Sequence, residues 1–314
     1  MKILIDIDEL ERGGVVSAPM AVTLRQHALR DTGSTAINIL LAFGAIAIAA
    51  GILALNPSTL AGALFGLAFV VAGGVLKTRP ASPWRKLGSI WMIVGALILA
   101  AGTGALIDQP FLACLAGALI LLVVGVLAGS RLLIALTPLA LLAAIGGSTG
   151  YWHACYEIVI REPTLTVLLF TALGYAGWHA VKATNGLTQD LALAFTRMSI
   201  ILVNFGFWIG SLWGDTPGHS WRQEFAGAGD RQIPELAFVL AWALALLAAG
   251  AWGARNGRRF LVNVAATFGG ILVYTQWFER MSLQPISVIA GGLFAIAIGL
   301  GLWTYNRREL EQRA

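Results

Sequence analysis

The 314-residue chain is 58% hydrophobic and only 12% charged, and its formal net charge is +5. A soluble domain carries about 25% charged residues, so this composition excludes a cytosolic enzyme, a disordered protein and a secreted disulfide scaffold. It indicates an integral membrane protein with many spans. Cys114 and Cys155 are the two cysteines, too few for a cysteine-rich metal or disulfide framework.

Residues 1–34 precede the first apolar stretch and predict a small cytoplasmic pair of helices. We expect one helix at about 6–12 and a second at about 18–30, because Gly13-Gly14 favours a turn between them. Apolar side chains alternate with basic and polar ones along the second helix. This amphipathic pattern suits a helix that binds another protein, and we expect residues 1–34 to bind a cytoplasmic protein partner.

A membrane-spanning helix needs about 20 mostly apolar residues. Ten stretches qualify: 36–55, 60–76, 87–107, 111–128, 132–148, 164–181, 192–213, 235–253, 260–278 and 285–304. The fold class is therefore all-α, a transmembrane helical bundle of about ten spans over residues 35–314. Short polar connections predict that neighbouring helices pack antiparallel, and two longer loops, 149–163 and 214–234, are expected on the outer side.

The distribution of positive charge supports this count. With both ends in the cytoplasm, the outer loops hold only Arg161, Arg222, Arg231 and Arg280 of the 21 basic residues, and Arg197 lies within the seventh span. The remaining basic residues fall in inner segments, as the positive-inside rule requires. We therefore expect a multi-pass protein of the bacterial inner membrane that contacts the lipid bilayer and no nucleic acid.

Three stretches carry a resemblance to a known family. They are "IDELERGGVVSAPMAVTLRQHAL", then "LLAFGAIAIAAGILAL" with "IWMIVGALILAAGTGALIDQP", and finally "RRFLVNVAATFGGILVYTQWFERMSLQPISVIAGGLFAIAIGLGLWTYNRRE". Together they resemble the bacterial predicted membrane proteins called domain of unknown function 2157. The chain departs from that pattern at Trp277-Phe278, where the family usually has Tyr-Phe, and residues 129–255 show no match. The resemblance implies a helical membrane protein and supplies no catalytic residues.

Arg197 is the one charge in the interior of a predicted span, away from its ends, and Asn204 lies two helical turns further along the same face. An ionisable residue inside a membrane is expensive and marks a candidate site. Asn38 and Asn263, each in the cytoplasmic half of a span, complete a hypothetical buried polar cluster. The alternative is that Arg197 extends its guanidinium back to the inner headgroups, and the sequence favours this alternative.

The outer loop 149–163 offers the strongest metal-ligand pattern, His153, Cys155 and Glu157 at alternate positions. Zinc needs three or four such ligands. An interfacial aromatic belt with incidental polar groups explains the same residues, so we expect neither a metal nor another cofactor. Cys114 and Cys155 both fall on the predicted outer side, which leaves a disulfide between them open.

Three functions fit these observations. A non-enzymatic structural, assembly or sensing role, with residues 1–34 docking a partner, is favoured. A small-solute transporter is the alternative, because ten spans divide into five plus five, an arrangement that inverted repeats use. A membrane enzyme working at the outer loops ranks last, since the sequence contains no recognisable nucleophile, base or metal set. Oligomeric state stays open.

Overall fold

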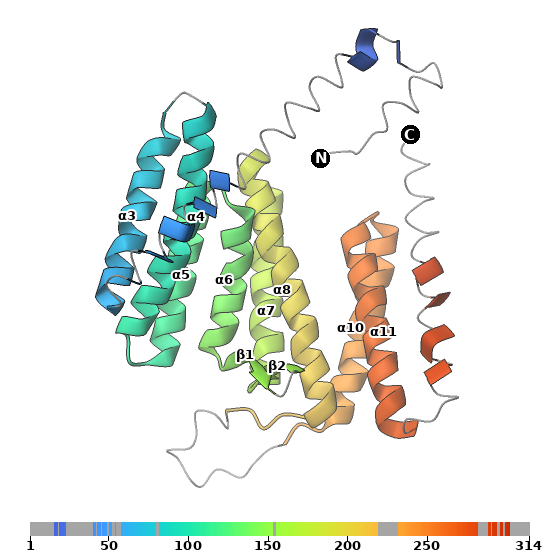
Figure 1. Cartoon of the computed structure of the whole chain (residues 1–314). Helices are drawn as coiled ribbons and strands as arrows, with labels where there is room; N and C mark the ends of the chain where they lie inside the picture. The colour runs from blue at the N-terminus through green and yellow to red at the C-terminus, as the bar shows by residue number, and fades with distance from the viewer. Residues whose placement is uncertain are drawn as a thin grey trace. The chain divides into compact units, whose positions relative to one another are not determined.

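The computed structural model describes residues 16–17, 19–22, scattered positions within 40–54, 58–79, 82–152, 155–218, 232–281 and scattered positions within 288–301 (Figure 1). The chain divides into two compact units. The first holds residues up to Asp108 together with Leu119–Leu133, and the second holds Gln109–Ala118 and the chain from Ile134 onward. We describe each unit by itself.

The first unit is built on an antiparallel pair, α3 (Thr59–Lys77) and α4 (Ser82–Leu106). Helix α3 begins where the Ser58 hydroxyl accepts a hydrogen bond from the Ala61 backbone N–H at 3.1 Å. Such a cap satisfies one of the unpaired N–H groups of the first turn. At the other end, Lys77 Nζ donates to the Leu127 carbonyl, 2.6 Å away.

Glycine allows α3 and α4 to touch backbone to backbone. Helix α4 carries Gly88, Gly95 and Gly102 at intervals of seven residues, which is one helix face. A Cβ atom at Gly95 would lie 2.7 Å from the Val70 backbone nitrogen and 2.8 Å from the Gly66 carbonyl oxygen. Any larger residue would push the helices apart. Membrane helices associate through this kind of close packing.

Helices α5 (Pro110–Ala128) and α6 (Arg131–Ala144) follow, and α6 is short. Its 14 residues rise about 21 Å, less than the hydrocarbon thickness of about 30 Å. The expected span 132–148 is thus not a single helix, because the chain turns at Ile145-Gly146 and enters a β-hairpin. Strand β1 (Gly147–Trp152) pairs antiparallel with β2 (Cys155–Ile160), from Gly147 opposite Ile160 to Trp152 opposite Cys155.

The described residues of the second unit include that hairpin and four long helices. They are α7 (Pro163–Ala183), α8 (Gly186–Trp213), α10 (Glu235–Arg255) and α11 (Arg259–Met281). Between α7 and α8, Phe170 is fully buried and packs with Leu202, Leu142 and Ile145. Short side chains bring these helices close, since a Cβ atom at Gly174 would lie 3.6 Å from Ser199 Cβ.

Aromatic side chains join α8 to α10 and α11. Trp242 is fully buried at the centre of this cluster, with its ring parallel to Phe207 at a centroid distance of 6.5 Å. Phe268 of α11 lies 6.4 Å from the Trp242 ring and 5.7 Å from Phe205. The Trp242 indole N–H, which would be costly to bury alone, donates to Asn204 Oδ1 at 2.9 Å.

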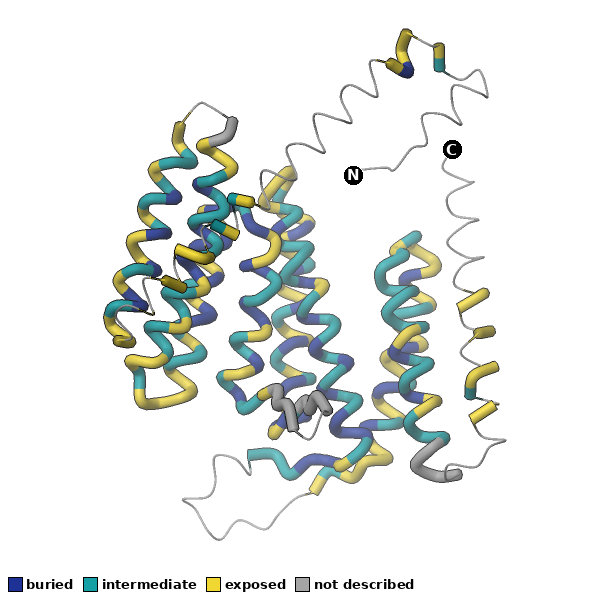
Figure 2. Tube along the Cα trace, in the orientation of Figure 1, coloured by how far each residue is buried: buried dark blue, intermediate teal, exposed yellow. Residues whose placement is uncertain are grey.

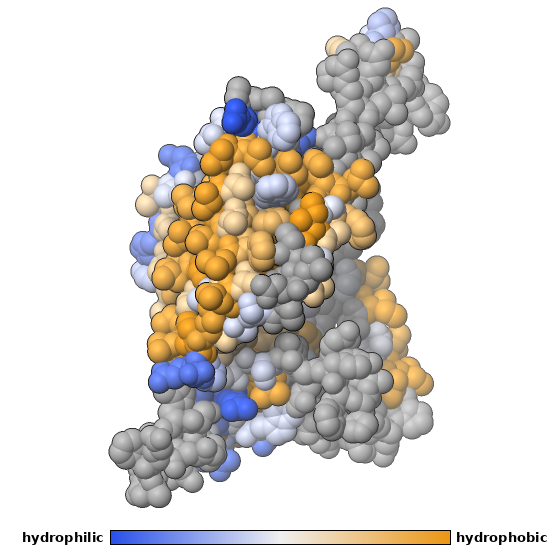
Figure 3. Space-filling model, turned by 60° about the vertical axis from the view of Figure 1, so that its left-hand side comes forward, coloured by the Kyte–Doolittle hydropathy of each residue, from blue (hydrophilic) through white to orange (hydrophobic). Residues whose placement is uncertain are grey.

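Outward-facing apolar side chains give these units a membrane surface. Leu64, Leu119, Leu168 and Leu247 are each more than half exposed, and exposed positions recur along the described helices (Figure 2). In the space-filling view, hydrophobic residues cover the helices of the visible face, while hydrophilic residues gather toward helix ends (Figure 3). An apolar surface of this extent is unfavourable in water.

Among the described residues, seven helices are long and apolar enough to cross a membrane: α3, α4, α5, α7, α8, α10 and α11. Each corresponds to one of the ten predicted spans, and the helical, membrane-embedded character of the chain is confirmed. The first and tenth predicted spans, 36–55 and 285–304, lie largely outside the described residues. The same holds for the N-terminal pair, of which only a helical turn at 19–22 is described.

Candidate functional site

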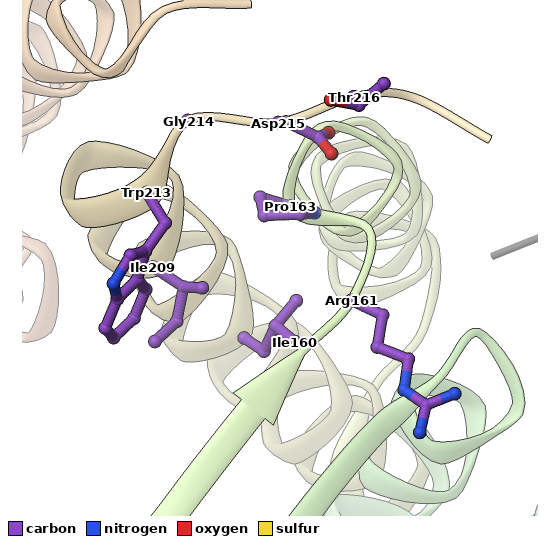
Figure 4. A pocket seen from close by; sticks show the side chains of 8 residues that line it. All are labelled: Ile160, Arg161, Pro163, Ile209, Trp213, Gly214, Asp215 and Thr216. Carbon is purple, nitrogen blue, oxygen red and sulfur yellow. The ribbon is translucent and has the colours of Figure 1, made fainter. Parts of the chain in front are cut away.

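The candidate site is a small pocket beside the β-hairpin, at the end of the second unit that we call the hairpin end (described residues 145–152, 155–164, 213–218 and 232–235). Its volume is about 340 Å³, near the lower limit for small-molecule sites. It is lined by Ile160, Arg161, Pro163, Ile209, Trp213, Gly214, Asp215 and Thr216. The Arg161 side chain extends away from Asp215 (Figure 4), and the lining combines polar and apolar side chains around the Asp215 carboxylate.

Two buried carboxylates fix the backbone around this pocket. Glu162 is 1% exposed and Asp215 is 6% exposed. Asp215 Oδ2 accepts a hydrogen bond from the Thr164 backbone N–H at 2.8 Å, and Glu162 Oε2 accepts one from the Gly218 backbone N–H at 2.8 Å. The start of α7 and the segment after α8 therefore each supply one carboxylate to a backbone N–H group of the other. We call this pair of bonds the carboxylate clamp.

Helix geometry explains why carboxylates suit this place. The first N–H groups of a helix have no partner within the helix, and negative charge is stabilised at that end. Thr164 is the second residue of α7, so Asp215 satisfies one such N–H group from a position 51 residues away. The Asp215 backbone also pairs with Ile233 in both directions, at 3.0 and 2.7 Å, which joins the end of α8 to the start of α10.

The clamp holds two segments of backbone together. Each carboxylate has an oxygen bound to a backbone amide, as in a helix cap. The pocket beside it presents the exposed ring of Trp213 and apolar side chains together with the polar groups of Asp215 and Thr216.

Of the predicted polar cluster, the structure describes three members. Asn204 accepts from Trp242 and donates its amide N–H to the Ile200 carbonyl at 2.8 Å. The Arg197 guanidinium lies 5.1 Å from the ring centroid of Phe260, the second residue of α11. Asn263 is partly buried on α11, and Asn38 lies outside the described residues. A cluster of all four residues stays a prediction.

The predicted metal ligands are described only in part. Cys155 and Glu157 lie two residues apart in β2, and His153 falls outside the described residues. Within the described part of the chain, no group of three or more His, Cys, Asp or Glu side chains is arranged to hold a metal ion. Cys114 is a free, partly exposed thiol.

The sequence analysis did not single out Glu162 or Asp215, and it missed the hydrogen bonds that their carboxylates accept. The local signals were Glu162 directly before Pro163, a favoured first helical residue, and Gly214-Asp215 directly after a long apolar helix. Neither signal identifies the other, because the bonded residues are 51 and 56 positions apart.

No family model, curated protein or solved structure matches the chain. The resemblance to the domain of unknown function 2157 family stays a prediction. What the fold defines is the class: a multi-pass integral membrane protein whose described helices include seven long enough to span a bilayer.

Proposed function

We propose that this protein is a non-enzymatic component of the bacterial inner membrane with a structural, assembly or sensing role. Its helices form a packed frame, both chain ends lie in the cytoplasm, and residues 1–34 dock a cytoplasmic protein partner. The observation that carries this proposal is the packing of the second unit halfway along its helices.

At mid-span, side chains fill the contacts between helices. Phe170, Ser199 and Trp242 are each 0% exposed, and Leu202 is 2% exposed. Ser199 Oγ donates within α8 to the Phe195 carbonyl at 3.0 Å, so its polar group is already paired. A transporter must open a water-filled path at this depth to move a small solute. The packing supports a fixed frame instead.

Cysteine accessibility tests the proposal. In a Cys114→Ser, Cys155→Ser background, Ser199→Cys introduces a thiol of similar size at the middle of α8. We expect a water-soluble maleimide to leave this thiol unmodified in native membranes and to modify it after denaturation. The matched control is Asn185→Cys, at an exposed position just before α8, which should react in opened membranes.

The outcome discriminates between the two functions. If Ser199→Cys reacts in native membranes at a rate similar to Asn185→Cys, water reaches the centre of the bundle. The frame proposal would then be wrong, and the transporter alternative would be favoured.

A further inference from the structure

Cations and tryptophans meet at the other end of the second unit, which we call the basic end (residues 178–187 and 252–260). Lys182 Nζ lies 5.4 Å from the Trp178 ring centroid, and Arg258 Cζ lies 4.9 Å from a centroid of the same residue. The Trp252 ring meets Trp178 edge to face, with centroids 6.1 Å apart. We call these four residues the basic–aromatic cluster.

The backbone holds both cations in place. Lys182 lies one helical turn after Trp178 in the last turn of α7, a spacing at which side chains meet. Arg258 follows Gly257, whose φ of 62° is readily adopted by glycine. The Arg258 N–H donates to the Gly253 carbonyl at 2.8 Å, and the Gly257 N–H donates to Ala254 at 3.4 Å. These two bonds form a Schellman motif, a stable helix ending.

Basic residues outnumber acidic ones in the two described segments that form this end. Residues 174–200 and 250–265 contain the basic residues Lys182, Arg197, Arg255, Arg258 and Arg259, and Asp190 is their one acid. Within the described part of the chain, the side chains of Lys182 and Arg258 form no salt bridge and no hydrogen bond. The Trp178 ring covers one side of each cation, so N–H donors on the other sides can bind a further partner.

An apolar surface continues from the cluster along α10. Ala241, Ala245 and Ala248 are all exposed and share the helix face of Trp252, because they precede it by 11, 7 and 4 residues. The cations therefore stand at one end of a smooth apolar strip on a membrane-spanning helix. Tryptophan prefers the boundary between headgroups and hydrocarbon, which places the cluster at headgroup depth.

We propose that the basic–aromatic cluster binds the phosphate of an anionic phospholipid, with an acyl chain along the alanine face of α10. Arg258 offers two parallel N–H donors to the phosphate oxygens, and Lys182 adds a point charge. The strip distinguishes a lipid from a free phosphate ion, which has no acyl chain to bury. This proposal does not depend on the structural, assembly or sensing role proposed above, and lipid binding alone tests it.

Thermal unfolding of the purified full-length protein in neutral detergent provides the test. The apparent melting temperature is measured while phosphatidylglycerol, phosphatidylcholine or inorganic phosphate is added. We expect phosphatidylglycerol to raise it at lower concentration than the other two. A basic residue near an anionic surface contributes about 1 kcal/mol, or about fivefold in affinity, so Arg258→Gln should require about fivefold more phosphatidylglycerol for half the effect.

Lys182→Gln is a second variant on a different helix and should weaken the response similarly, whether or not Arg258→Gln folds. Arg255→Gln is the matched control, since it removes the same charge from an exposed position three residues before Arg258, outside the cluster. The control should respond like the unmodified protein. Equal responses to both phospholipids, an equal response to inorganic phosphate, or equal weakening in Arg255→Gln and the cluster variants would each overturn the proposal.

Discussion

The two ends of the second unit handle charge in opposite ways. At the hairpin end, Glu162 and Asp215 are buried and bound to backbone N–H groups of other segments. At the basic end, Lys182 and Arg258 are exposed and lie against a tryptophan ring. The first arrangement uses its polar groups to hold the fold together. The second leaves donors available to a molecule outside the chain.

This contrast has an energetic basis. A buried donor that loses its partner costs about 1–3 kcal/mol, whereas an exposed charge that loses a neighbour usually costs less than about 1 kcal/mol. Changes at the hairpin end should therefore lower stability, and changes at the basic end should affect binding instead.

The largest effect is expected from breaking the carboxylate clamp. Asp215→Ala removes the acceptor of the Thr164 N–H and leaves that partly buried group without this bond at the start of α7. We expect a loss of about 1–3 kcal/mol in stability, visible as a lower apparent melting temperature in detergent.

Asp215→Asn is the matched control, because it keeps a side-chain oxygen that accepts the same bond without the charge. Its loss should be smaller than that of Asp215→Ala. If both variants melt at the temperature of the unmodified protein, the clamp does not stabilise this end.

A smaller effect is expected at the basic end. Lys182→Gln, measured without added lipid, should change stability by no more than about 0.5 kcal/mol, as is usual for exposed positions. The same melting assay checks this value. A loss as large as that of Asp215→Ala would show that Lys182 supports the fold, and the contrast between the two ends would disappear.

The helices were predictable because each depends on a local signal. An apolar window of helical length between polar residues is visible in any sequence, and seven such windows correspond to long described helices. The fifth window, 132–148, was too long, because Ile145, Gly146 and Gly147 do not lower its hydropathy although the helix ends at Ala144. The hairpin after α6 depends on pairing between Gly147–Trp152 and Cys155–Ile160, which no single window shows.

The sites were less predictable because their parts come from distant segments. Arg197 drew attention as a charge within an apolar stretch, yet its ring partner Phe260 is on another helix. Trp178 and Arg258 are separated by 80 positions, and the described helices α8 and α10 lie between them in the chain. Residue type suggests what a side chain can bind, but only the packing of helices decides which partner is near.

The most direct test of this account is the side of the membrane that each flank of α8 faces. Its 28 residues rise about 42 Å, which exceeds the bilayer core of about 30 Å. Thr216 follows α8 at the hairpin end, and Asn185 precedes it at the basic end. In the Cys114→Ser, Cys155→Ser background, each position is changed to cysteine separately. Intact spheroplasts are then treated with a membrane-impermeant maleimide.

We expect Thr216→Cys to react in intact spheroplasts and Asn185→Cys to react only after the membrane is opened, because the basic end belongs in the cytoplasm. Both should react in detergent, which controls for local burial. Reaction of Asn185→Cys alone in intact spheroplasts would show that α8 crosses the membrane in the opposite orientation to the one predicted. Reaction of both would contradict the claim that α8 crosses the membrane.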